Sequence, residues 1–145
     1  MFGIERSAWG LAIVSAVLQV VIFPLPNLYV LSWVAVAPLV VAILRARRPG
    51  PLQLEGSIKL LPASPIQGFL LGYLCGILWY AGNCYWVYNT MKQFGGIGAL
   101  GAAGLLLLFC LYLGLYQAAF GLVTALVARR SVRTALVAAP FVWVA

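Results

Sequence analysis

Three cysteines and one cluster of aromatic residues are the parts of this 145-residue chain whose residue types suit chemistry or ligand binding. A thiol such as that of Cys75, Cys84 or Cys110 becomes a nucleophile when a nearby base or cation favours the thiolate. These cysteines lie in apolar runs and form no Cys-x-x-Cys pair, and the chain has no histidine. We therefore expect them to pack as small apolar side chains. We expect no catalytic residue, no cofactor and no metal site in this chain.

The aromatic cluster occupies residues 79–88 (WYAGNCYWVY), where five of the ten positions are Trp or Tyr. It ends a long apolar run that begins near Ile66, and a Gly95-Gly96 turn follows it. Trp and Tyr gather where an apolar layer meets a polar one, because their rings are apolar and their N–H or O–H groups are not. The cluster predicts a membrane surface, either as a simple anchor or as a place of lipid contact. The candidate outer-leaflet lipid contacts are Trp79, Tyr80, Asn83, Tyr85, Trp86 and Tyr88.

The composition predicts an all-α, polytopic membrane protein. The chain is 65% hydrophobic and 8% charged, against about 25% charged residues in soluble domains, so the excess apolar surface must face lipid. Five apolar segments contain few or no charges and can be compared with the ~20 residues that span a bilayer. A proline-rich loop at 45–65 separates the second segment from the third. The expected spans are 8–23, 28–44, 66–88, 97–128 and 134–145, the last of them incomplete.

Basic residues flank these segments at alternate ends. Eight of the nine lie before the first segment, in the 45–65 loop, or between the fourth and fifth segments, and Lys92 alone lies on the other side. Because basic loops stay in the cytoplasm, we expect a cytoplasmic N-terminus, a cytoplasmic 45–65 linker and an outward-facing aromatic cluster. The cations are not interleaved with aromatic residues, so we expect no nucleic-acid partner.

Small residues predict how the helices pack. Gly68, Gly72 and Gly76 recur at every fourth position, which puts them on one helix face and lets another helix approach closely. Helix packing is our interpretation, and room for a lipid chain is the alternative. The fourth segment is longer than a bilayer requires, so we expect tilt or a non-helical start through 95–104. No segment holds a charged residue or histidine, which disfavours an ion-coupled carrier.

Several motifs, in this order and spacing, resemble those of the apolipoprotein N-acyltransferase family along essentially the whole chain. The first hairpin of that family is similar to FPLPN at 23–27, LSWVA at 31–35 and Pro38-Leu39. Its third span and outward turn are similar to Gly68-Phe69 with Gly72 and Gly76, then WVY at 86–88 and FGG at 94–96. The start of its next helix is similar to APFVWV at 139–144.

The resemblance implies a multi-pass enzyme of the bacterial inner membrane. Such an enzyme moves an acyl chain from a phospholipid, through a cysteine thioester, to the α-amine of the diacylglyceryl-cysteine of a lipoprotein. In the family, a nitrilase-like periplasmic domain carries a Glu-Lys-Cys triad. No cysteine here matches that nucleophile, so we expect an amino-terminal membrane fragment that is inactive alone. The alternative is a small facilitative transporter or a structural membrane subunit complete in itself.

Overall fold

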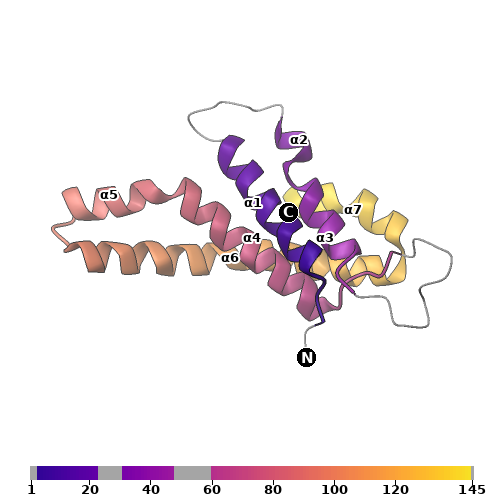
Figure 1. Ribbon diagram of the computed structural model, residues 1–145. Coiled ribbons are helices and arrows are strands. Elements are labelled where there is room, and N and C mark those ends of the chain that lie inside the picture. Colours follow the sequence, from indigo (N-terminus) through magenta and orange to yellow (C-terminus); the bar gives the residue numbers. More distant parts are fainter. Residues whose placement is uncertain (1–2, 23–30, 48–59, 145) are drawn as a thin grey trace.

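The computed structural model describes residues 3–22, 31–47 and 60–144, and within these ranges the chain is all-helical (Figure 1). The pairing of Ile4 with Arg47 is an isolated bridge. The all-α prediction is therefore confirmed for the described residues. The helices are α1 (Arg6–Ile22), α2 (Ser32–Ala35), α3 (Ala37–Leu44), α4 (Pro65–Asn83), α5 (Tyr85–Gln93), α6 (Ala99–Arg130) and α7 (Val132–Val144).

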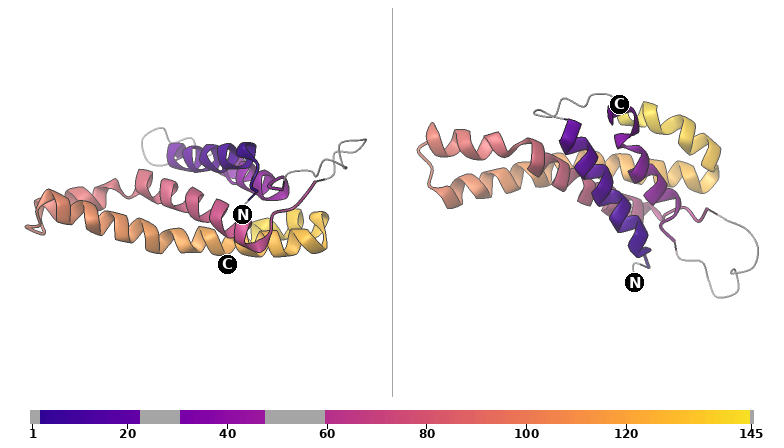
Figure 2. Two further views of the ribbon diagram at one scale, coloured as in Figure 1. Left: turned by 60° about the horizontal axis from the view of Figure 1, so that its bottom comes forward. Right: turned by 45° about the horizontal axis from the view of Figure 1, so that its top comes forward.

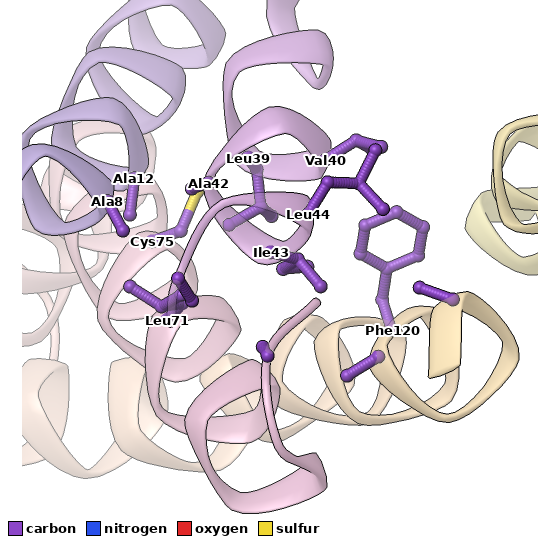
Figure 3. Close-up of a cluster of buried hydrophobic side chains, with 14 of the residues drawn as sticks. Ala8, Ala12, Leu39, Val40, Ala42, Ile43, Leu44, Leu71, Cys75 and Phe120 are labelled. Atoms are coloured by element: carbon purple, nitrogen blue, oxygen red, sulfur yellow. The ribbon is translucent and has the colours of Figure 1, made fainter. Parts of the chain in front are cut away.

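Two layers of helices build the bundle. The left view of Figure 2 shows α1 and α3 stacked on a layer formed by α4, α6 and α7. The core between the layers contains the fully buried side chains of Leu39, Ile43, Leu71 and Cys75 (Figure 3). The contribution of α1 to this core is a row of buried alanines at every fourth position, which lets α1 lie close to its neighbours. These alanines are Ala8, Ala12 and Ala16.

One part of the molecule extends beyond the bundle. In every view, α5 and the beginning of α6 run side by side away from α1, α3 and α7 (Figures 1 and 2). A tight turn joins them, in which Gly96 has a φ of 63°. Only glycine adopts this left-handed conformation without a steric cost. We call α5 together with residues 99–110 of α6 the arm.

The basic ends of several helices gather at the opposite end of the bundle. Glu5 N–H donates to the Ala46 carbonyl at 2.9 Å, which places the start of α1 beside the end of α3. A Cβ atom on Gly68 would lie 2.6 Å from the Ala125 Cβ atom, so the start of α4 lies beside the end of α6. The cations near this end include Arg6, Arg45, Arg47, Arg129, Arg130 and Arg133.

The expected span over 66–88 contains parts of two helices rather than one helix. Helix α4 ends at Asn83 and α5 begins at Tyr85, with Cys84 between them at φ −98° and ψ 16°. Gly82 and Asn83 are both weak helix formers. The Asn83 amide also donates to the Trp79 carbonyl at 3.3 Å, which competes with the backbone ladder. These residues end the helix although hydropathy continues through them.

The bounds of the other four expected spans agree with those of the observed helices to different extents. Helices α1, α6 and α7 lie within two residues of the expected bounds at each end that the structure describes. The second span is divided into α2 and α3, and its turn at 23–30 lies outside the described residues, as does most of the 45–65 linker. The glycine-rich start of the fourth span is non-helical only as far as Gly98. Among the described helices, α6 alone is long and apolar enough to cross a membrane.

Helix α4 begins with a complete cap. Ser64 Oγ accepts the Gln67 backbone N–H at 3.3 Å, and the Gln67 side chain accepts the Ser64 N–H at 2.8 Å. This reciprocal pair satisfies two donors that a helix start would otherwise leave free. Pro65 follows at the first helical position, where its missing N–H costs nothing. The sequence therefore determines where α4 starts much more sharply than where it ends.

Replacing Ser64 with alanine tests this cap. We expect Ser64→Ala to lower the free energy of unfolding by about 1 kcal/mol, because the Gln67 N–H loses its acceptor. Reversible unfolding in mixed detergent micelles, followed by far-ultraviolet circular dichroism, measures the change. Ser7→Ala is the control, since Ser7 is exposed on α1. Equal effects of the two substitutions would contradict a capping role for Ser64.

Candidate functional site

The structure divides the predicted aromatic cluster into an inward and an outward group. Trp79 lies at the end of α4, and its ring centroid is 4.6 Å from that of Tyr80 and 6.2 Å from that of Trp143 on α7. Tyr85 and Trp86 begin α5 and remain 48% and 56% exposed. The inward group, Trp79 and Tyr80, packs helices together. The outward group, Tyr85 and Trp86, has exposed side chains that a ligand can contact.

The inward group includes two residues that the sequence prediction missed. Trp143 meets Phe120 edge to face, with ring centroids 5.1 Å apart and an interplanar angle of 86°. Its other neighbour is Trp79, so the three rings join α4, α6 and α7. Aromatic pairs in this geometry each add about 0.5–1.5 kcal/mol beyond the burial of their area. No local sequence signal marks this cluster, because its members are far apart in the chain.

Two polar atoms at the end of α4 lack a protein partner. The Asn83 Oδ1 atom and the Trp79 Nε1 atom are buried, and neither forms a hydrogen bond within the described part of the chain. Asn83 and Trp79 are one helical turn apart, so a free acceptor and a free donor lie close to the break between α4 and α5. A buried polar atom without a partner is costly. A polar ligand group or water at this position would remove that cost.

Among the described residues, Lys92 is the one cation at this end of the molecule, and it lies beside an aromatic ring. Lys92 lies in the last turn of α5, and its Nζ atom is 5.9 Å from the centroid of the Tyr88 ring. This separation lies within the range of a cation–π interaction. The Lys92 ammonium group therefore lies near the face of the Tyr88 ring at the exposed end of α5.

The three predicted packing glycines lie where α4 crosses α6. A Cβ atom on Gly68 would be 2.5 Å from the Gly121 carbonyl oxygen, and one on Gly72 would overlap the Gln117 carbonyl oxygen. At Gly76 the nearest atom would be the Gln117 Cβ atom at 2.7 Å. All three distances are too short for a real Cβ atom, so the two helix backbones approach as closely as glycine permits.

A buried chain of hydrogen bonds joins four helices beside this crossing. Gln117 Nε2 on α6 donates to Gln19 Oε1 on α1 at 3.3 Å. Gln19 Nε2 in turn donates to Ser15 Oγ at 3.2 Å and lies 3.5 Å from Cys75 Sγ on α4. Ser15 Oγ then donates to the Ala35 carbonyl of α2 at 2.6 Å. Gln19 and Gln117 are 4% and 3% exposed, so this network lies in the interior.

The cysteines occupy three different environments. Cys75 is buried and belongs to the Gln19 network, Cys110 is buried on α6, and Cys84 is half-buried at the helix break. All three thiols are free. Within residues 3–22, 31–47 and 60–144, no base or cation contacts the Cys75 thiol, which accepts a hydrogen bond from the neutral amide of Gln19. Packing is the role that this geometry supports for Cys75.

These features define an all-helical protein with one helix able to cross a membrane, a basic end, and an aromatic arm at the other end. The family model of the apolipoprotein N-acyltransferase N-terminal domain matches residues 15–145. The chain therefore belongs to the apolipoprotein N-acyltransferase family. No solved structure shows significant similarity to the chain.

Three curated relatives carry the same name, apolipoprotein N-acyltransferase. The protein of Geobacter metallireducens is 31% identical over 143 residues, which are 97% of this chain and 24% of the relative. The Chromobacterium violaceum protein is 39% identical over 66 residues, or 46% of this chain and 13% of the relative. The Methylococcus capsulatus protein is 41% identical over 61 residues, or 42% of this chain and 12% of the relative. The chain thus spans about a quarter of the Geobacter protein.

Proposed function

We propose that this chain is the amino-terminal membrane portion of an enzyme that acylates lipoproteins. The acyl donor is a phospholipid, and the acceptor is the α-amine of the diacylglyceryl-cysteine of a lipoprotein. A cysteine thioester outside residues 1–145 carries the acyl chain between them. The task of this chain is to anchor that catalytic part and to form a lipid-accessible cleft at the outer leaflet. The observation that carries the proposal is the match of the family model to residues 15–145.

The distribution of charge supports a multi-pass topology in the bacterial inner membrane. The basic residues at the ends of α3 and α6 lie at one end of the bundle, and Lys92 lies on the arm at the other. Basic loops face the cytoplasm. We therefore propose that the N-terminus and the 45–65 linker face the cytoplasm and that the arm faces the side of the proposed acyl transfer. The five expected spans belong to this proposal.

The outward aromatic residues are the proposed lipid contacts of this chain. Tyr85 and Trp86 are exposed at the start of α5, and the unpartnered Asn83 Oδ1 atom lies just before them. Together they combine apolar rings with a hydrogen-bond acceptor, which suits a lipid at the boundary of its acyl chains and head group. Trp79, Tyr80 and Tyr88 support this surface from the two adjoining helices.

Replacing Trp86 with alanine tests the proposal. In the full reading frame that contains this chain, we expect Trp86→Ala to lower acyl transfer about threefold, since an exposed aromatic contact contributes ~0.5–1.5 kcal/mol. Transfer from phospholipid to a diacylglyceryl peptide in reconstituted vesicles measures the effect. The amount of folded protein should not change, because Trp86 is 56% exposed and leaves no cavity.

Two matched variants make this result specific. Trp86→Phe retains the ring and should keep most of the activity. Phe141→Ala removes another aromatic side chain, 74% exposed on α7, and should leave transfer unchanged. If the Trp86→Ala variant transfers acyl chains at the normal rate, Trp86 does not contact the substrate. A complete reading frame without acyl transfer to the peptide would end the proposed function itself.

A further inference from the structure

An apolar groove lies between helices α3 and α7, in the bundle and apart from the arm. Its volume is about 440 Å³, which lies within the ~300–1,000 Å³ of pockets that hold small ligands. Among the side chains that line it, Ser32 and Trp143 carry the polar atoms, and the others are valine, leucine, alanine or proline. The lining suits a hydrocarbon chain and offers little to a polar ligand.

The two walls of the groove run antiparallel from the basic end of the bundle. Val41 lines it one turn before the end of α3, and Leu136 lines it one turn after the start of α7. Ser32 and Val144 line its other end. From Leu136 to Val144, α7 rises about 12 Å, close to ~15 Å, which is half of the ~30 Å hydrocarbon layer. The groove is therefore about as long as the hydrocarbon part of one leaflet.

Two arginines flank the groove where it reaches the basic end. Arg45 follows Val41 by four positions, and Arg133 precedes Leu136 by three. Residues three or four positions apart lie on the same side of a helix, so each arginine continues one wall of the groove. Both side chains are exposed. Because guanidinium groups bind phosphate through paired hydrogen bonds, an apolar groove that ends between two of them is complementary to a phospholipid.

The other charges at this end favour a lipid with net negative charge. Arg6, Arg47, Arg129 and Arg130 lie at the same end, whereas Glu5 is the one acid among the described residues. Anionic and zwitterionic phospholipids both carry a phosphate, so the phosphate contact alone does not distinguish them. A zwitterionic lipid also carries an ammonium group, which this excess of arginines repels. Clusters of basic residues at the cytoplasmic surface attract anionic lipids for this reason.

We propose that the α3–α7 groove holds one acyl chain of an anionic phospholipid from the cytoplasmic leaflet, and that Arg45 and Arg133 bind its phosphate. The inference rests on the proposed function for its membrane orientation, and it does not depend on the proposed reaction. The groove opens toward the membrane surface opposite the proposed acyl transfer. The bound molecule is therefore a structural lipid that bridges α3 and α7, and it is distinct from the acyl donor.

Photolabelling of the full-length protein in phosphatidylcholine vesicles tests this inference. The vesicles contain a trace of phosphatidylglycerol or of phosphatidylcholine, each with a diazirine on one acyl chain, and mass spectrometry locates the label. We expect the anionic probe to label residues 36–41 and 136–144 at least fivefold more than the zwitterionic probe, the preference that one cation at a membrane surface gives. The exposed positions 13, 14 and 17 of α1 should be labelled equally by both probes.

Substitutions on neighbouring positions of α7 test whether the label lies in the groove. Leu136→Trp fills the groove and should reduce its labelling severalfold. Val137→Trp is the matched control, since Val137 is 69% exposed and does not line the groove, and it should leave the labelling unchanged. Circular dichroism and elution from a sizing column establish folding, and Val41→Phe replaces Leu136→Trp should that variant misfold.

Substitutions of single arginines test the proposed phosphate contact. Arg133→Gln should lower the preference for the anionic probe severalfold, and Arg133→Lys should retain most of it. Arg6→Gln removes the same charge at the start of α1, a helix that does not contact α7 within the described residues. It should leave the preference unchanged. Equal effects of Arg6→Gln and Arg133→Gln would mean that net charge alone attracts the lipid, with no site at Arg133.

Three further results would overturn the inference: equal labelling by both probes, labelling that Leu136→Trp does not change, or no labelling of the groove by either probe. The last result would mean that another segment of the full-length protein, or a second copy, covers the groove. Acyl transfer is measured on the same samples. A labelled but inactive protein removes the proposed function and keeps this inference, whereas an active protein with an unlabelled groove does the reverse.

Discussion

Gly72→Ala is expected to destabilise the protein by about 3 kcal/mol, the upper end of the cost of overpacking a close contact. The added Cβ atom would overlap the Gln117 carbonyl oxygen and lie 3.0 Å from the Gln117 carbonyl carbon and 3.2 Å from the Ala118 Cα atom. These are backbone atoms in the middle of α6, so no side-chain rotation can relieve the overlap. The helices must move apart, and the core contacts beside them are lost.

Gly10→Ala is the matched control for this substitution. Gly10 is also inside a helix, but a Cβ atom there would have nothing within 4 Å. Alanine is the better helix former by ~1 kcal/mol, so this variant should be as stable as the parent or slightly more stable. Unfolding titrations in mixed micelles compare the two variants. Equal stability of Gly72→Ala and Gly10→Ala would show that the α4–α6 crossing is not tight at Gly72.

Gln19→Met is expected to lower the free energy of unfolding by about 2 kcal/mol, because buried groups that lose their partners retain the cost of desolvation. Methionine has a similar length, so packing changes little. The substitution removes the acceptor of Gln117 Nε2 and the donor to Ser15 Oγ. Gln117 Nε2 is then buried without this acceptor, whereas Ser15 Oγ keeps its bond to the Ala35 carbonyl.

A double-mutant cycle separates the Gln19–Gln117 hydrogen bond from its surroundings. Gln19→Met, Gln117→Met and the double variant are unfolded under the same conditions. Coupling of about 0.6 kcal/mol is expected, the average found for hydrogen bonds between membrane helices, with about 1.7 kcal/mol as the upper limit. Additive effects would mean that the 3.3 Å contact between these side chains contributes nothing to stability.

Hydropathy predicts where most of the helices lie, since apolar runs in this chain are long and sharply bounded. It misses the break at Cys84 because the break depends on local hydrogen bonds. The Asn83 amide donates to the Trp79 carbonyl, and neither residue lowers the hydropathy of the run enough to show it. The spacing of Gly68, Gly72 and Gly76 correctly predicts which face of α4 packs closely against another helix, because residues four positions apart lie on one side of a helix. The partner helix α6 could not be named from that spacing.

The candidate site was predicted by residue type but not by arrangement. The clustering of Trp and Tyr at 79–88 identifies the region, yet it gives no reason why Trp79 turns inward while Trp86 remains exposed. That difference comes from Trp143, which lies 64 positions after Trp79 and contacts it only in the folded chain. Val87 of α5 and Leu108 of α6 likewise line the same groove, although they are far apart in the chain. The spacing of apolar residues along one segment does not predict which distant segment that segment contacts.

The connection between α6 and α7 consists of one non-helical residue, Ser131. The Phe120–Trp143 contact shows that the two helices then run antiparallel, as in an αα-hairpin. Because one residue links the two helices, the direction of one helix fixes the direction of the other. In the membrane topology proposed above, the pair would enter the lipid as one unit, with Arg129, Arg130 and Arg133 together on the cytoplasmic side. The orientation of α6 would then also set the orientation of α7.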